Sequence, residues 1–196
     1  MKNKIEIIAE IAQGYEGNEK LTHLLTKGAI ASNADAVKFQ LVYADELATP
    51  DYEYYDLFKE LEMDKDVWVN VCNQIHNADK KVYFDVFGLF SLDMAKEIGA
   101  DGVKLSTTEF YNNALFDRAI AKFDTLYLSV GGIPAEDIDQ KLSALSVEQV
   151  NKICLMYGFQ SEPTPLDQNN LNKLSILKNR YPDFRIGFMD HSDGAL

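Results

Sequence analysis

The segment Asp35-Ala-Val-Lys-Phe-Gln40 sets a lysine and a glutamine into a short apolar run. Two apolar residues alternate with Lys38 and Gln40, which is the period of a β-strand whose side chains point to opposite faces. In an α/β protein such a strand is covered on both faces and is almost wholly apolar. A buried ammonium group is unfavourable unless it has a fixed anion, a bound anion or a lowered pKa. A ligand phosphate or carboxylate is one anion that fills this role.

The composition is that of a globular domain. The chain has 196 residues, of which 46% are hydrophobic, and this is enough for one well-filled core. No apolar run reaches the roughly 18 residues that a membrane helix needs, and the first residues do not form a signal peptide. Cys72 and Cys154 have no metal-like spacing. We therefore expect a cytoplasmic protein with reduced thiols.

The net charge of the chain is -12 at pH 7. Nucleic acids and anionic membrane surfaces select basic proteins, so this charge argues against both as partners. A small anionic ligand responds to a few local lysines and backbone N–H groups instead. The acidic composition therefore leaves such a ligand open.

Strand-like and helix-like segments alternate along the whole chain. Strands are expected at residues 5–12, 35–41, 81–87, 102–106, 125–130, 153–159 and 185–189. Helices are expected at 19–32, 64–78, 89–98, 112–122, 135–145, 146–152 and 168–181. The first helix is expected to bury Leu21, Leu24, Leu25, Ala29 and Ile30. The aromatic-rich segment 43–61 is longer than a usual connection, which makes it a candidate lid or subsite wall.

This alternation predicts parallel strands with right-handed crossovers, in either a doubly wound sheet or a (β/α)8 barrel. An open sheet would carry a glycine-rich phosphate turn after its first strand, and Gln13-Gly-Tyr-Glu-Gly17 does not match that fingerprint. Polar residues follow nearly every strand, as in barrels. We therefore predict an α/β fold of the (β/α)8 TIM-barrel type. Residues 1–196 are expected to form a single domain that is truncated before strand eight.

Polar side chains gather at the expected strand ends. They are Glu10, Lys38, Gln40, Asp85, Lys104, Ser106, Thr107, Ser129, Tyr157, Gln160, Asp190 and His191. A closed barrel brings its strand ends to one mouth. Two lysines there, with hydroxyl groups and the N–H groups of Gly131 and Gly132, would suit an anion that bears phosphate.

Several separately placed motifs resemble the sialic acid synthase family, which comprises N-acetylneuraminate synthases and related nonulosonate synthases. The motifs are Glu10, Val37-Lys-Phe-Gln40, Val103-Lys-Leu-Ser-Thr107, Leu128-Ser-Val-Gly-Gly132, Gln160-Ser-Glu-Pro-Thr164 with Asn170-Leu171, and Gly187-Phe-Met-Asp-His191. They occur in the order of the family and span almost the whole chain.

The resemblance implies a barrel enzyme that condenses phosphoenolpyruvate with an open-chain N-acetylated amino sugar, typically N-acetylmannosamine. Carbon 3 of the enol attacks the sugar aldehyde, water adds to carbon 2, and phosphate leaves by C–O cleavage. A longer protein of this kind is expected to form a homodimer. We expect no antifreeze-like C-terminal domain, which many members carry, within residues 1–196.

The resemblance also implies roles for single residues. Phosphoenolpyruvate is expected to contact Lys38, Lys104, Thr107 and Ser129. The sugar or the reacting centre is expected to face Glu10, Gln40 and Glu109. The catalytic residues are expected to be Glu10, Glu109 and His191.

Two positions depart from the family pattern. The family binds a divalent metal, manganese or magnesium, through two histidines, and the metal polarises the aldehyde. His191 matches one of these positions, but Tyr157 occupies the other, and a neutral phenol is a poor ligand for such a metal. We therefore expect weak metal binding. Asp85 stands where the family has a hydroxyl residue, and its carboxylate would repel an anion unless it is paired or turned away.

Two other functions remain open from the sequence. In a Schiff-base aldolase, Lys104 or Lys38 would be a desolvated nucleophile. A degenerate barrel would bind a sugar or an anion without catalysis, and the departures at Tyr157 and Asp85 motivate this alternative.

Overall fold

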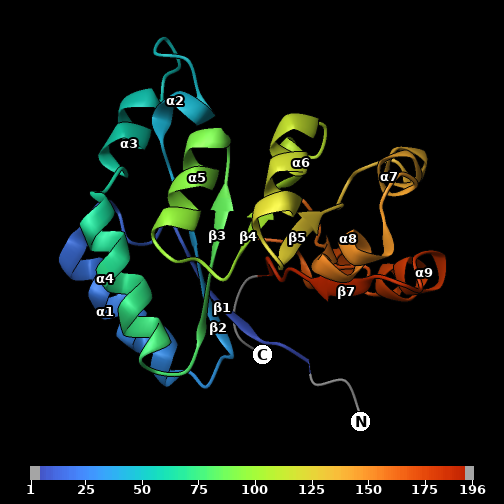
Figure 1. Ribbon diagram of the computed structural model, residues 1–196, viewed down its shortest axis with the longest axis horizontal. Coiled ribbons are helices and arrows are strands. Elements are labelled where there is room, and N and C mark those ends of the chain that lie inside the picture. The colour runs from blue at the N-terminus through green and yellow to red at the C-terminus, as the bar shows by residue number, and fades with distance from the viewer. Residues whose placement is uncertain (1–4, 193–196) are drawn as a thin grey trace. The chain divides into compact units, whose positions relative to one another are not determined.

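Helices and strands alternate throughout the part of the chain that the structure describes. The structure is a computed structural model, and it describes residues 5–192. The chain divides into two compact units, the first ending at Lys104 and the second beginning at Leu105. Each unit is an α/β arrangement in its own right (Figure 1).

The first unit contains three parallel strands and the helices that connect them. Its elements are β1 (Ile8–Ala12), α1 (Glu19–Ala31), β2 (Ala36–Gln40), α2 (Ala44–Leu47), α3 (Tyr55–Glu60), α4 (Lys65–His76), β3 (Lys81–Val86) and α5 (Leu89–Glu97), followed by β4 (Gly102–Leu105) at the boundary. Strand β2 pairs in parallel with both β1 and β3. Helices α1 and α4 lie side by side (Figure 1). The first strand begins at Ile8, three residues later than predicted, and the other boundaries agree closely.

The second unit repeats this pattern. Its elements are the 3-10 turn η1 (Thr107–Glu109), α6 (Asn113–Lys122), β5 (Leu126–Ser129), α7 (Ala135–Leu142), α8 (Val147–Lys152), β6 (Ile153–Tyr157), η2 (Leu166–Gln168), α9 (Asn172–Arg180) and β7 (Arg185–Phe188). Strand β6 pairs in parallel with β5 and β7. The predicted helix at 168–181 begins only at Asn172, because the residues before it form the separate turn η2.

The strands of the first unit have one aromatic face. Phe39 of β2 stacks on Phe84 of β3 with ring centroids 5.7 Å apart. Trp68 of α4 makes edge-to-face contacts with both rings and with Tyr15, at 5.1–5.4 Å. Because side chains alternate along a strand, Lys38 and Asp85 belong to the opposite face. Helix packing therefore uses the apolar face and leaves the other face to polar groups.

The buried side of α1 agrees with the prediction only in part. Ala29 is buried as predicted, and Leu21, Leu25 and Ile30 are half-buried. Leu24 is instead 63% exposed, and Thr22 and Thr26 are buried. Each threonine hydroxyl donates to a backbone carbonyl one turn earlier, Thr22 to Asn18 and Thr26 to Thr22, both at 2.7 Å. A hydroxyl satisfied within its own helix can be buried at little cost. Two threonines therefore form part of the buried face in place of Leu24.

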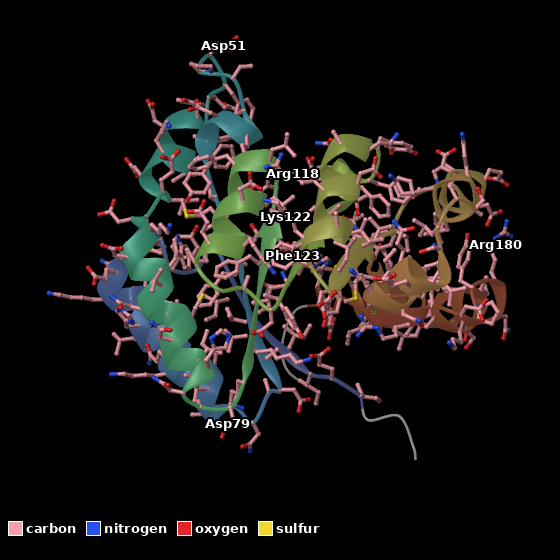
Figure 2. The ribbon with its side chains drawn as sticks, in the orientation of Figure 1. Asp51, Asp79, Arg118, Lys122, Phe123 and Arg180 are labelled. Carbon is pink, nitrogen blue, oxygen red and sulfur yellow. The ribbon has the colours of Figure 1, made fainter. Side chains whose placement is uncertain are left out.

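The predicted lid segment at 43–61 contains the short helices α2 and α3. Figure 2 shows Asp51 at the tip of the loop between them. The hydroxyl of Tyr55 donates to the carboxylate of Asp45, and the ammonium of Lys59 lies 3.0 Å from the carboxylate of Glu62. These exposed contacts hold the segment together. Its role as a lid stays a prediction.

Helix α9 is attached to α7 within the second unit through Asp139. The guanidinium of Arg180, labelled in Figure 2, donates to both oxygens of this carboxylate. The hydroxyl of Tyr181 donates to it at 2.9 Å. Arg180 lowers the pKa of the Asp139 carboxyl, with the Tyr181 hydrogen bond adding to the effect.

Over residues 5–192, the helices are too short or too polar to cross a membrane.

Unfolding measurements can test the packing of Trp68 and the exposure of Leu24. Trp68→Ala should lower the free energy of unfolding by about 3–5 kcal/mol, because it removes a ring that is packed against three others. Leu24→Ala is the control and should change it by less than about 0.5 kcal/mol, because this side chain is exposed. Urea unfolding followed by far-UV circular dichroism measures both. A large loss in the Leu24 variant would contradict the observed orientation of α1.

Candidate functional site

A buried cluster of charges lies on the polar face of the first unit. Asp85 accepts a hydrogen bond from Lys38 through Oδ1 at 2.7 Å and from Lys104 through Oδ2 at 2.6 Å. Asp85 is 1% exposed and each lysine is 7% exposed. Glu10 forms a further ion pair with Lys38. The two predicted lysines are therefore brought together around one internal carboxylate.

The strand register explains this arrangement. Glu10 of β1 lies opposite Lys38 of β2, and Gln40 lies opposite Asp85 of β3. Side chains two residues apart share a face, so Lys38 and Gln40 lie on the same side of β2. A lysine side chain is long enough to reach the carboxylate on the next strand. The second oxygen of Glu10 accepts from the N–H of Ala12 at 2.9 Å, which fixes the carboxylate near the end of its strand.

The electrostatics of the cluster resolve the unfavourable burial of Lys38. Burial alone would lower the pKa of Lys38, but the charges of Asp85 and Glu10 outweigh it and raise that pKa. Burial likewise opposes ionisation of Asp85, and the two lysines still hold the pKa of its carboxyl below the ordinary value. Lys38 and Asp85 therefore both carry their charges near neutral pH. A buried lysine needs a fixed anion, a bound anion or a lowered pKa, and Lys38 has a fixed anion in Asp85.

Gln40 ends β2 beside this cluster. Its backbone carbonyl accepts a hydrogen bond from the hydroxyl of buried Tyr15 at 3.0 Å. This bond ties the end of the strand to the segment after β1. The side chain of Gln40 is half-buried, so it can still contact a ligand.

A pair of hydroxyl groups lies in the second unit. Oγ1 of Thr107 is 2.8 Å from Oγ of Ser129, at the end of β5. Thr107 also lies 3.4 Å from the carbonyl of Gly131. A side chain at Gly131 would meet the carbonyl of Gly158 at 2.3 Å, so the close approach of these two loops requires glycine. Glycine thus sets the position of the backbone next to the two hydroxyl groups.

Glu109 lies in the 3-10 turn that begins at Thr107. Its carboxylate accepts a hydrogen bond from the side-chain amide of Asn112 at 3.0 Å. The residue is half-buried. Its predicted role toward the sugar stays a prediction.

Tyr157 and His191, the predicted metal positions, follow neighbouring strands of the second unit. The hydroxyl of Tyr157 donates to the backbone carbonyl of Asn169 at 3.0 Å, and burial raises the pKa of this phenol. Nδ1 of His191 is 2.9 Å from the carbonyl of Phe159. Because a carbonyl only accepts, Nδ1 carries the proton in the neutral ring and Nε2 keeps a lone pair. Nε2 of His191 is thus able to bind a metal ion. The neutral hydroxyl of Tyr157, in contrast, already donates its proton to the carbonyl of Asn169.

The donor set does not fit a divalent metal. Within residues 5–192, the structure contains no group of three or more His, Cys, Asp and Glu side chains that could hold a metal ion. His191 alone offers one nitrogen, and catalytic metals are usually held by three protein ligands. The side-chain oxygen of Asn169 is buried without a hydrogen-bond partner. One amide oxygen and one imidazole do not complete such a site.

The pairing of Asp85 was predicted only as one of two ways to avoid repelling an anion, and the burial of Asn169 was not predicted. Asp85 is visible in the sequence as the acidic residue of an otherwise apolar strand, Lys81-Val-Tyr-Phe-Asp-Val86. A buried acid there, together with two buried lysines, is a signal for pairing. Asn169 precedes the quoted motif Asn170-Leu171 and carries no comparable signal.

Asp85→Asn should show how much the fold depends on the cluster. At neutral pH it should lower the free energy of unfolding by about 3–5 kcal/mol, because two buried lysines lose their shared partner. The folded-state pKa of Asp85 is lowered, so its contribution is present above the ordinary aspartate value and is lost as the pH falls through the folded value. The difference between the variant and the original protein should therefore shrink in acid.

The control is Asp79→Asn, in the exposed turn between α4 and β3 (Figure 2). Its backbone φ of 55° suits asparagine. Urea unfolding from pH 7 down to pH 3 should show a constant difference of less than about 0.5 kcal/mol for this variant. Equal behaviour of the two variants would contradict a buried pair at Asp85.

Comparisons with known proteins give this geometry a context. The crystal structure of N-acetylneuraminic acid (sialic acid) synthetase from Leptospira borgpetersenii serovar Hardjo-bovis, in complex with citrate, superposes with a TM-score of 0.87 at 25% identity. The match covers 99% of this chain and 70% of that chain. This likeness confirms the predicted α/β fold of the (β/α)8-barrel type.

Curated relatives match over nearly the whole chain. The spore coat polysaccharide biosynthesis protein SpsE of Bacillus subtilis is 25% identical, over 95% of this chain and 53% of its own length. The N-acetylneuraminate-9-phosphate synthase of Drosophila melanogaster is 24% identical, over 99% of this chain and 56% of its own length. The chain therefore spans about half the length of these relatives. The model of the NeuB family matches residues 25–196, and the chain belongs to this family.

Proposed function

We propose that this chain belongs to an enzyme that condenses phosphoenolpyruvate with an N-acetylated amino sugar, such as N-acetylmannosamine, to give a nonulosonic acid and phosphate. The observation that carries the proposal is the buried pair of lysines in β2 and β4, in a member of the NeuB family. The names of its relatives support the reaction class, since they include synthases of N-acetylneuraminate-9-phosphate and of N,N'-diacetyllegionaminic acid.

In this proposal the lysines of the first unit bind the anionic groups of phosphoenolpyruvate. Lys38 and Lys104 are held in place before the ligand arrives, because Asp85 fixes both ammonium groups. Fixed charges in a site that excludes water stabilise developing negative charge without reorganisation. The lysines would thus favour departure of phosphate from carbon 2 after the enol has attacked the aldehyde.

The remaining predicted residues have hydrogen-bonding roles in this proposal. Glu10 and Gln40 in the first unit would hold hydroxyl or amide groups of the sugar, and Glu109 would do so in the second. The hydroxyl groups of Thr107 and Ser129 would donate to oxygens of phosphoenolpyruvate. His191 would accept a proton or a hydrogen bond through Nε2, since its Nδ1 is bound to a carbonyl. No step is assigned to a metal, because Tyr157 does not suit one.

The Schiff-base alternative has less support. A lysine nucleophile must lose its proton, and desolvation next to another cation usually provides this. Lys38 instead lies between two carboxylates, and its pKa is raised. Lys104 is bound to the buried carboxylate of Asp85. Lys38 is therefore stabilised in the form that cannot attack a carbonyl, and the amine of Lys104 is already bound to a carboxylate.

A non-catalytic binding protein is the second candidate. Two observations favour it, namely the neutral phenol of Tyr157 at a predicted metal position and the carboxylate of Asp85 at the lysine pair. Such a protein would bind a sugar or an anion and release no phosphate. Turnover distinguishes it from the proposed enzyme.

A phosphate-release assay tests the proposed reaction. The protein is incubated with phosphoenolpyruvate and N-acetylmannosamine, with and without manganese, and the nonulosonic acid is identified by mass spectrometry. Lys38→Ala should reduce turnover by about 10²-fold or more, because it removes a charge that stabilises the transition state. Lys65→Ala is the control, since this exposed lysine pairs with Glu97 on the surface, and it should change turnover by less than roughly twofold.

The same assay shows when the proposal is wrong. Phosphate release that survives Lys38→Ala would remove the lysine pair from the mechanism. Binding of sugar or phosphoenolpyruvate with no release of phosphate, over a panel of N-acetylated amino sugars, would favour the non-catalytic alternative. A covalent adduct trapped by borohydride with a keto-acid would instead favour the Schiff-base aldolase.

A further inference from the structure

We infer that Asp85 is a specificity-determining residue that competes with the anionic group of the ligand for Lys38 and Lys104. The inference rests on one part of the proposed function, namely that Lys38 and Lys104 bind the anionic group of the ligand. The carboxylate of Asp85 already occupies, within the chain, the position that a ligand phosphate or carboxylate would take between the two ammonium groups.

The hydrogen-bond geometry supports direct competition. Each oxygen of Asp85 serves a different lysine, at 2.7 Å for Lys38 and 2.6 Å for Lys104. The Asp85 side chain is almost completely buried, so water does not weaken these bonds. Lys38 also pairs with Glu10, so two of its three N–H donors face carboxylates. An incoming anion must displace Asp85 from at least one ammonium group or bind to the donors that remain.

The charge of the cluster supports the same conclusion. Lys38 and Lys104 contribute two positive charges, and Asp85 and Glu10 contribute two negative charges. The four side chains therefore sum to zero. A dianion such as phosphate is therefore attracted less strongly to the cluster than it would be to the two lysines alone. Asp85 thus excludes small free anions and favours a ligand that forms further contacts elsewhere.

The direct test compares binding of inorganic phosphate to the protein and to Asp85→Asn at constant ionic strength, set with chloride. Isothermal titration calorimetry should give a Kd for phosphate at least about tenfold lower in the variant, because one internal negative charge has been removed. Asp79→Asn is the matched control, with the same chemical change in an exposed turn (Figure 2). Its Kd should equal that of the original protein.

Thermal unfolding provides a second measurement, because Asp85→Asn is expected to be less stable. A ligand that binds the folded state raises the unfolding temperature, and at a fixed ligand concentration a lower Kd gives a larger rise. Phosphate should therefore raise the unfolding temperature of Asp85→Asn more than that of the original protein or of Asp79→Asn. An equal shift in all three proteins would overturn the inference.

If Asp85→Asn does not fold even with phosphate, Glu10→Gln tests whether a carboxylate of the cluster weakens phosphate binding to the lysines. The Glu10 side chain is 44% exposed, so its replacement is tolerated more easily, and it also leaves the cluster with one net positive charge. Phosphate should bind this variant more tightly than the original protein, by a smaller factor than for Asp85→Asn. An unchanged Kd in Glu10→Gln, with Asp85→Asn unfolded, would count against the competition.

The outcomes for the inference and for the proposed function are separable. Tighter phosphate binding in Asp85→Asn, with no turnover of phosphoenolpyruvate in any protein, would support the competition and reject the enzyme. Turnover that depends on Lys38, with equal phosphate binding in Asp85→Asn and Asp79→Asn, would support the enzyme and reject the competition.

Discussion

The pairing of Asp85 with two buried lysines is the interaction on which the polar face of the first unit depends. A single buried ammonium group would favour unfolding or loss of its proton, and two of them would also repel each other. One carboxylate with an oxygen for each lysine removes both costs. Because the partner is covalently part of the chain, Lys38 and Lys104 keep their positions without a ligand. The pairing therefore couples the fold to the chemistry that the lysines can perform.

The division between the two faces of the strands makes this cluster possible. Phe39 and Phe84 pack against Trp68 on the helix side, so that hydrophobic burial is complete there. The opposite face is then free to carry Lys38 and Asp85 at positions next to these rings in the sequence. In the second unit, Gly131 allows two loops to approach each other next to the hydroxyl groups of Thr107 and Ser129. In each unit, polar side chains of the site are therefore positioned by strands, such as Lys38 in β2 and Ser129 in β5.

Much of this could be predicted from local patterns, because period-two alternation and strand–helix spacing depend on neighbouring residues. The strand around Lys38, and its need for an anion, follow from such a pattern. The identity of the anion does not, because Asp85 is 47 residues away and reaches Lys38 only through the register of β2 and β3. The burial of Leu24 in α1 was predicted wrongly for a related reason. The hydroxyl groups of Thr22 and Thr26 are satisfied within the helix, which hydrophobic periodicity cannot detect. The chemical roles of Glu109 and His191 stay predictions.

The hydrogen bond from Tyr157 to the carbonyl of Asn169 has a consequence for how the segment after β6 is maintained. A bond inside the chain closes this segment at a strand end where related proteins are expected to use an ion. Its conformation should therefore not vary with the supply of trace metals in the cell, and chelating agents should leave it intact. Its shape would then depend on a hydrogen bond to the chain's own backbone.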